Sequence, residues 1–318
     1  MRVERSGPTG RIVMGTAAVL LVAFSMQRVA RAGQGSSTED ADRLLKGTID
    51  IHVHSEPDNV PRIRDGIELA QLARARGMRG IVLKNHLDPT SGLAFLARKG
   101  APGLEVFGGV DLNLTVGGMN PAAVEHVGTV SGGYGKVVWM STTDSEDGAR
   151  LAKDNRPFVR VARDGVLVPE AKAVIAAIVK NHLVMATGHT SAVEALMLLR
   201  EGRAQGLTRM VVTHALKESP NMSVAQMQEA GSLGAYLEFA GGTTTRPDDP
   251  AKLDQHADAI RKVGVEHCIL SSDLGGRNTP LPTDGYAAYL LALKARGFTE
   301  AELGRMSREN PARLLGLP

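Results

Sequence analysis

Histidines stand at the ends of several short apolar runs in this sequence, and their spacing could hold a metal ion. His52 and His54 are separated by one residue, so both side chains point to the same face if this run forms a β-strand. His189, His214 and Asp273 end or follow three other runs. Neutral imidazole and carboxylate groups are common ligands of zinc and similar divalent ions. One such histidine would mean little, but five candidate ligands at four strand ends predict a metal site.

The elements that must position these side chains are eight apolar or β-branched runs, which alternate with helix-like segments. Eight strands alternating with helices in about 270 residues predict an α/β fold, a (β/α)8 TIM barrel in a single domain. The candidate ligands then meet at the carboxyl-terminal mouth of the barrel. A doubly wound open sheet is the alternative, but no glycine-rich phosphate loop follows the first strand. The runs are Thr48–His54, Gly80–Lys84, Leu104–Asp111, Lys136–Thr142, Leu183–Thr187, Met210–His214, Ala235–Ala240 and Cys268–Asp273.

Helix signals lie between the strands, because short polar side chains satisfy the free N–H groups at a helix N-terminus. The predicted signals are an apolar pattern over Ile63–Arg76, the capping boxes Ser191–Glu194 and Ser223–Gln226, and a cap at Asn310 before Ala312–Leu315.

The longest connection runs from Asp144 to Pro169. Within it, Arg163-Asp164-Gly165 separates two short apolar runs and predicts a hairpin. The connection follows the fourth strand, so it would overhang the catalytic end of a barrel. A substrate-covering loop and a purely structural insertion are both open.

The first 32 residues have the pattern of a secretory signal. A basic start precedes an apolar run over Ile12–Met26, and Ala30-Arg31-Ala32 resembles a cleavage site. The run has 15 residues, whereas a membrane span needs about 20. We expect residues 1–32 to be a signal peptide and residues 33–318 to form the barrel of an exported protein, periplasmic or secreted, with no stable membrane span. An uncleaved anchor is the alternative.

Charge and composition argue against nucleic acid as a partner. The formal net charge is +3, but residues 1–32 contribute five arginines and one glutamate, which leaves −1 on the rest. Aromatic residues make up 3%, too few for a surface that stacks bases. We expect a small-molecule partner, and a homodimer is one open oligomeric state. The single Cys268 excludes an intramolecular disulfide and is expected to be a buried structural thiol.

The ordered set of motifs resembles the metal-dependent amidohydrolase superfamily. The set consists of His-x-His on the first strand, a histidine after the fifth, a histidine after the sixth and an aspartate after the eighth, with Asn310-Pro311-Ala312-Arg313-Leu314-Leu315-Gly316 similar to a closing helix. The resemblance covers about Ile49 to Leu317. It implies a barrel that holds one or two divalent ions, usually zinc, which activate water. His52, His54, His189 and Asp273 would be ligands, and His214 would bind a second ion or the substrate.

The sequence departs from this superfamily in the bridging ligand, which relatives often supply as a carboxylated lysine or a glutamate from the third or fourth strand. Lys136 lies at the wrong end of the fourth strand, whereas Lys84 ends the second. Lys84 could be a carbamate that bridges metals, a cation for a substrate carboxylate, or a buried lysine that releases its proton easily. His86 shares a strand face with Lys84 and is a candidate ligand or substrate contact; an ordinary loop histidine is the alternative.

Weaker candidates are Glu238 and Arg277 as substrate contacts, and Asp111 and Asn113 as groups that orient a ligand imidazole. Glu238 could equally be an ion-paired strand carboxylate, and Arg277 a solvated loop residue. Four other histidines fall on helices or at the wrong strand ends, and we expect them to be structural or exposed: His126, His182, His256 and His267.

The predicted chemistry is hydrolysis of an amide, lactone or related ester-like bond by metal-activated water. Asp273 would accept the proton of that water and pass it to the leaving group. A lyase such as a decarboxylase with one metal, and a non-catalytic metal-binding protein of the exported space, are the alternatives. A catalytic site keeps one coordination position open, which a binding protein need not do.

Overall fold

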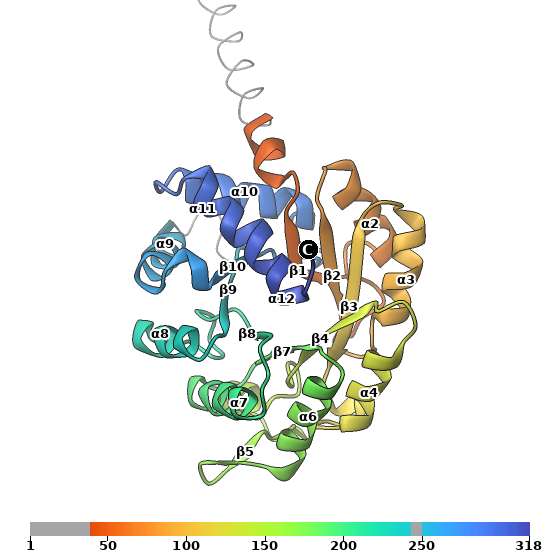
Figure 1. Cartoon of the computed structure of the whole chain (residues 1–318), viewed down its shortest axis with the longest axis vertical. Coiled ribbons are helices and arrows are strands. Elements are labelled where there is room, and N and C mark those ends of the chain that lie inside the picture. The colour runs from red at the N-terminus through yellow and green to blue at the C-terminus, as the bar shows by residue number, and fades with distance from the viewer. Residues whose placement is uncertain (1–38, 243–249) are drawn as a thin grey trace, which may run out of the picture. The chain divides into compact units, whose positions relative to one another are not determined.

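Eight parallel strands follow one another around a barrel in the order of the sequence (Figure 1). All eight predicted strands are present. They are β1 (Ile49–His54), β2 (Gly80–Lys84), β3 (Glu105–Asp111), β4 (Gly135–Trp139), β7 (Val184–Ala186), β8 (Met210–Val212), β9 (Tyr236–Ala240) and β10 (Cys268–Ser271). β2 has the predicted bounds, β4 begins one residue and ends three residues earlier than predicted, and the other six are shorter by one or two residues. A parallel bridge between Val53 and Leu274 joins the first strand to the end of the last. The predicted (β/α)8 barrel is therefore confirmed.

This computed structural model describes residues 39–242 and 250–318. Residues 42–318 form one compact unit, and the described residues 39–41, which belong to a separate N-terminal unit, are helical. The predicted signal peptide at residues 1–32 lies outside the described residues. In the parts described, none of the helices is both long and apolar enough to cross a membrane.

Helices connect the strands and surround the barrel (Figure 1). The capping boxes at Ser191 and Ser223 are present as predicted. Asp65 caps the first helix after β1, which therefore begins at Gly66 and not at Ile63. The helices are α2 (Gly66–Ala75), α3 (Ser91–Gly100), α4 (Pro121–Thr129), α5 (Glu146–Ala152), α6 (Pro169–Lys180), α7 (Ala192–Ala204), α8 (Val224–Ser232), α9 (Pro250–Val263), α10 (Pro282–Lys294), α11 (Glu300–Gly304) and α12 (Asn310–Leu315), with short helical turns at Leu114–Val116, Val265–His267 and Arg305–Glu309.

The predicted cap at Asn310 is wrong. Asn310 has helical backbone angles and continues a helical run from α11, through Arg305–Glu309, into α12. Its side-chain amide instead donates hydrogen bonds to the carbonyl oxygens of Val265 and Cys268, at 2.9 and 2.7 Å. Asn310 thus ties the closing helix to the start of β10.

The floor of the barrel is apolar, which leaves polar groups for the opposite end. Ile49, Ile51 and Val82 of the first strands pack in one buried cluster with Leu314 and Leu315 of α12. The amino-terminal halves of the strands are therefore closed by the last helix, and the candidate ligands stand at the carboxyl-terminal ends.

The connection after β4 contains both α5 and the predicted hairpin. Strands β5 (Ala162–Arg163) and β6 (Val166–Leu167) pair in antiparallel fashion. Asp164 and Gly165 between them both have positive φ, as a tight two-residue turn requires. Helix α5 precedes the hairpin, and its residues Leu151 and Ala152 line a cavity together with His189 and His214.

Candidate metal centre

Three predicted ligands meet where the first and last strands close the barrel. His52 Nε2 lies 3.1 Å and His54 Nε2 lies 3.2 Å from the same oxygen, Asp273 Oδ1. The three side chains are buried or nearly so, with exposures of 2%, 7% and 8%. They form one of the two groups in the described residues whose donor atoms lie close enough together to share an ion. The predicted His-x-His and aspartate therefore do converge.

Glu238 holds His52 from behind. Its Oε1 lies 2.9 Å from His52 Nδ1 and accepts the hydroxyl of Ser271 at 2.7 Å, while Oε2 accepts the backbone N–H of His214 at 2.9 Å. A carboxylate on Nδ1 fixes the tautomer and the orientation of a ligating imidazole. Glu238, expected as a substrate contact, is thus placed as a positioning residue for His52.

His189 and His214 continue the cluster along the mouth. The ring of His214 lies 6.1 Å from that of His52 and 4.8 Å from that of His189, between centroids. His189 follows Gly188, whose backbone has positive φ and where a Cβ would lie 2.2 Å from the carbonyl oxygen of Met140. The chain can turn there only with glycine, and this turn brings His189 beside His214.

Two of the candidate ligands have a strained backbone. His214 and Asp273 have φ of 28° and 51°, in the left-handed region that non-glycine residues rarely adopt. Such conformations cost about 1–3 kcal/mol and collect at functional sites, where the surrounding structure holds them. The strain is consistent with a site selected for the position of these two side chains.

Lys217 is a site residue that the sequence analysis missed. Its Nζ contacts Asp273 Oδ2, so the two oxygens of Asp273 are divided between the histidines and this lysine. The available signal was its place three residues after His214, in the loop that follows β8. Loops after barrel strands build the active sites of this fold.

The protonation states suit metal binding. Burial, and then the charge of Lys217, lower the pKa of His214 to about 3, and burial lowers the pKa of His54 to about 4. Burial alone would raise the pKa of Asp273, but the charges of His52 and Lys217 outweigh it and hold the pKa well below its usual range. Neutral histidines and an ionised carboxylate are the forms that bind a metal.

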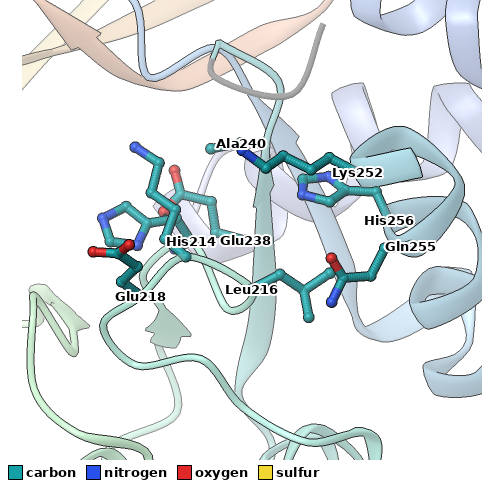
Figure 2. A pocket seen from close by; sticks show the side chains of 9 residues that line it. His214, Leu216, Glu218, Glu238, Ala240, Lys252, Gln255 and His256 are labelled. Atoms are coloured by element: carbon teal, nitrogen blue, oxygen red, sulfur yellow. Dashed lines mark hydrogen bonds between the residues drawn. The ribbon is translucent and has the colours of Figure 1, made fainter. Parts of the chain in front are cut away.

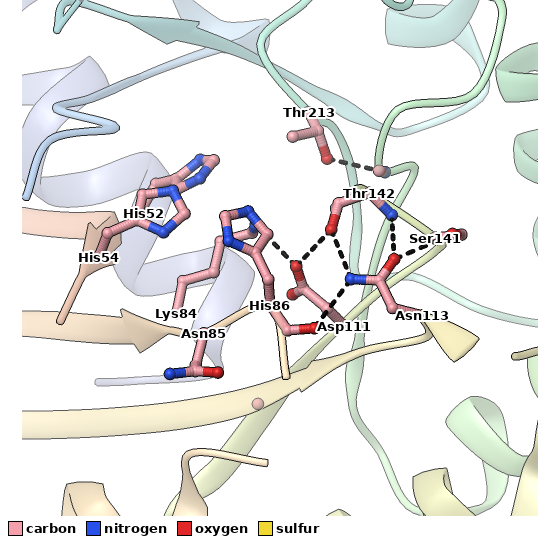
Figure 3. Close-up of polar contacts among 12 residues, drawn as sticks. His52, His54, Lys84, Asn85, His86, Asp111, Asn113, Ser141, Thr142 and Thr213 are labelled. Atoms are coloured by element: carbon pink, nitrogen blue, oxygen red, sulfur yellow. Dashed lines mark hydrogen bonds and ion pairs between the residues drawn. The ribbon is translucent and has the colours of Figure 1, made fainter. Parts of the chain in front are cut away.

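Lys84 is paired with Asp111 and not with a histidine (Figure 3). Its Nζ donates to Asp111 Oδ2 at 2.8 Å, the hydroxyl of Thr142 donates to the same oxygen at 2.7 Å, and both charged side chains are 1% exposed. Asp111, expected to orient an imidazole, orients this lysine instead. The nitrogen that a carbamate would have to modify is thus in a buried contact with a carboxylate. The metal-ligand role of Lys84 stays a prediction.

Asn113 ties the ends of β3 and β4 together beside this pair (Figure 3). Its amide donates to the carbonyl of His86 and to the hydroxyl of Thr142, both at 3.0 Å, and its oxygen accepts the N–H of Thr142 at 2.9 Å. Asn113 therefore positions strand ends and the loop of His86, but no ligand imidazole.

His86 lies beside His54, with 4.8 Å between ring centroids. His54, His86 and Asp58 form the second group of potential ligands in the described residues. Asp58 Oδ2 lies 3.1 Å from His86 Nδ1 and also contacts the guanidinium of Arg62. The guanidinium of Arg62 thus already supplies a positive charge to the carboxylate of this second group. Asp58 was missed by the sequence analysis, and substrate contact by His86 stays a prediction.

The remaining candidates are dispersed. Arg277 is exposed in the loop after Asp273. Cys268 is buried and burial raises the pKa of its thiol, which fits a structural role. His256, expected to be structural or exposed, is buried and lines a cavity next to His214.

The residues present fit a divalent ion. His52 Nε2, His54 Nδ1 and His214 Nδ1 are buried without a hydrogen-bond partner among the described residues. Buried polar atoms normally have partners, and such exceptions need an explanation. For His52 Nε2, the donor set of His52 Nε2, His54 Nε2 and Asp273 Oδ1 supplies it, since an ion bound between these three atoms would satisfy the nitrogen.

Comparison with known proteins agrees with the fold. The family model DUF6282, a family of unknown function, matches residues 47–238. No curated protein matches the sequence. Among solved structures, an amidohydrolase from Pseudomonas aeruginosa shares 12% identity, with a TM-score of 0.56 over 88% of this chain and 98% of that one.

Two further solved structures give similar values. An organophosphorus hydrolase from Deinococcus radiodurans shares 17% identity, with a TM-score of 0.57 over 87% of this chain and 94% of that one. A protein engineered for organophosphate hydrolysis from a weak promiscuous lactonase template shares 16% identity, with a TM-score of 0.55 over 87% and 97%. These likenesses show the barrel fold that the resemblance to metal-dependent amidohydrolases implied.

Proposed function

We propose that this chain, which belongs to DUF6282, a family of unknown function, is a metal-dependent hydrolase. The reason is that it folds as a barrel with the candidate metal centre at the mouth. It would cleave an amide, lactone or related ester-like bond. The observation that carries the proposal is the convergence of His52 and His54 on Asp273 Oδ1, with Glu238 behind His52.

A divalent ion at this site would supply a Lewis acid for the scissile carbonyl and would lower the pKa of water to about 7. His52 and His54 would hold it through Nε2, together with Asp273 Oδ1. Glu238 keeps the ring of His52 in one orientation, so its Nε2 stays directed at the centre. The site is therefore preorganised by protein groups.

Asp273 is the group best placed to move a proton. It lies at the centre, and its second oxygen contacts Lys217, which lines a cavity at the mouth. A carboxylate at the reacting atoms can take the proton of attacking water and return it to the leaving group. Lys217 would hold the carboxylate ionised and in position for this transfer.

The fold neighbours support the reaction class. They carry the names amidohydrolase and organophosphorus hydrolase, and one derives from a lactonase. Site chemistry, not fold, must decide the bond that is cleaved. Zinc as the ion, export and a homodimer stay predictions.

The test is turnover by metal-replete protein on a panel of lactones, N-acyl amino acids and organophosphate esters. We expect hydrolysis of one class, and a loss of about 10²–10⁴-fold in kcat for Asp273→Asn with an unchanged circular dichroism spectrum. Near-full activity in this variant would remove Asp273 from the mechanism. Carbon dioxide released from a carboxylic acid substrate, without hydrolysis, would favour the lyase.

A further inference from the structure

A cavity of about 200 Å³ opens beside the candidate centre, between the loop after β8 and helix α9 (Figure 2). His214, Lys217 and Glu238 of the site line one side. Lys252 and His256 of α9 line the other. The cavity therefore adjoins the centre through Lys217 and Glu238, which contact Asp273 and His52, and it is large enough for a small polar group.

Three side chains of α9 face this cavity together: Lys252, Gln255 and His256. Their spacing of i, i+3 and i+4 places them on one face of a helix. Among the described residues of the lining, the acidic ones are Glu218, at the exposed rim, and Glu238. Both oxygens of Glu238 already accept hydrogen bonds, from Ser271 and from the backbone N–H of His214.

His256 presents a hydrogen-bond donor to the cavity. Its Nδ1 lies 2.8 Å from the hydroxyl of Tyr289, and this is the one hydrogen bond that either side chain makes among the described residues. The buried hydroxyl of Tyr289 needs an acceptor, so it donates to Nδ1 and leaves the proton of the imidazole on Nε2. Burial, and then the charge of Lys217, lower the pKa of His256 to about 4, which keeps the ring neutral at pH 7.

We propose that this cavity is the subsite for a carboxylate group of the substrate, bound by Lys217, Lys252 and His256. Two ammonium groups, one imidazole N–H and the amide of Gln255 line a small enclosed space, and a carboxylate accepts from each of these donors. The inference rests on the proposed hydrolase and names its substrate class, a carboxylate-bearing amide or ester.

A second cavity, of about 610 Å³, lies on the other side of Lys217 and is lined by Leu151 and Ala152 of α5. It shares His214 and Lys217 with the first cavity. A substrate whose carboxylate lies against α9 would therefore place its reacting bond at the centre and its leaving group under α5. The insertion after β4 thus lines the space for the leaving group.

The experiment is isothermal titration of the metal-replete protein with succinate, and with the uncharged succinamide as control. We expect saturable binding of succinate only, weakened about tenfold or more by Lys252→Met and by His256→Asn. Asparagine can keep a hydrogen bond to Tyr289 while it removes the donor at Nε2. Lys262→Met, on the exposed side of the same helix, is the charge-matched control and should bind as the unaltered protein does.

Equal affinity of the unaltered protein and both variants would overturn the proposal, as would equal binding of succinamide. Succinate could also bind only when the metal is present, with an affinity that neither substitution changes. It would then lie on the ion and not in the cavity, which also overturns the proposal. Metal content and turnover are measured separately on the same samples. A protein that binds succinate in the cavity but lacks hydrolytic activity would retain the subsite and lose the proposed function.

Discussion

At the scale of single residues, His52 is held between two carboxylates. Glu238 lies 2.9 Å from Nδ1 and Asp273 lies 3.1 Å from Nε2. Burial alone would raise the pKa of Glu238, but the charge and the hydrogen bond of His52 lower it to about 2. Glu238 is therefore ionised at neutral pH and can fix the orientation of the imidazole that it holds.

Glu238→Gln should weaken metal binding by about 10–100-fold, because the amide cannot supply the charge that orients His52. Competition with a fluorescent chelator measures the change. Glu218→Gln, at the exposed rim of the same cavity, is the matched control and should leave metal affinity as it is. Equal affinities in the two variants would mean that Glu238 has no part in holding His52.

The contact of Lys84 with Asp111 leads to a prediction for the number of ions at the site. Since Nζ of Lys84 is held by Asp111, we expect one equivalent of metal in the unaltered protein and one in Lys84→Met, by elemental analysis of protein purified without chelator. Lys84→Met also leaves the buried carboxylate of Asp111 without its positively charged partner. The free energy of unfolding should therefore fall by about 3–5 kcal/mol. Two equivalents that fall to one in the variant would instead establish a bridging carbamate.

The positions of the candidate ligand histidines could be predicted from the sequence because strand periodicity and strand ends locate them without tertiary detail. Lys217, Asp58 and His256 could not. The first two lie in loops whose paths depend on packing, and His256 reaches the site only because of the way α9 is rotated against the barrel. Glu238 was found, but its partner His52 is 186 positions away, and strand register alone brings them together.

At the scale of elements, β3 and β4 show how glycine sets the register that aligns the mouth. Their pairing shifts between Gly108 and Gly109. A Cβ on Gly109 would lie 1.9 Å from the carbonyl oxygen of Val137. This close approach lets the ends of the two strands meet, where Asp111 contacts Thr142.

Gly109→Ala should destabilise the protein by about 3 kcal/mol or more, because β3 and β4 would have to separate. Urea unfolding followed by circular dichroism measures the loss. Gly92→Ala is the control, since a Cβ there has open space within a helix, and stability should be unchanged or rise by up to about 1 kcal/mol. Equal stability of the two variants would show that the sheet accommodates a side chain at residue 109.

All eight strands were predictable because buried parallel strands appear as short apolar runs between turn signals. Helix ends were less so. The predicted cap at Asn310 failed because the sequence does not distinguish an asparagine that caps a helix from one that bonds to another segment. Here the backbone of Asn310 is already helical, and its side-chain amide donates to the carbonyl groups of Val265 and Cys268.

At the scale of the whole molecule, the candidate centre lies on the seam of the barrel. His52 and His54 belong to β1, and Asp273 follows β10. The two edges join through the bridge of Val53 with Leu274 and through the hydrogen bond from Asp273 N–H to the carbonyl of His52, 2.9 Å long. An ion bound there would connect the first strand to the last.

Removal of metal should therefore lower global stability. At a free metal concentration 100 times the dissociation constant, binding contributes about 2.7 kcal/mol. We expect the melting temperature to fall on treatment with chelator and to recover on addition of zinc. Asp273→Asn should lose most of this response. A melting temperature that is indifferent to metal would exclude an ion across the seam.

The position of Asp273 also dictates when the centre can form during synthesis. This carboxylate lies 219 residues after His54, so a nascent chain carries its paired histidines long before it carries their anionic partner. Until the last strand docks, His52 and His54 alone can coordinate an ion only weakly, through two imidazole nitrogens. We therefore expect an ion to bind only at the end of folding. A polypeptide that ends before residue 273 would lack the carboxylate ligand and would not complete the site.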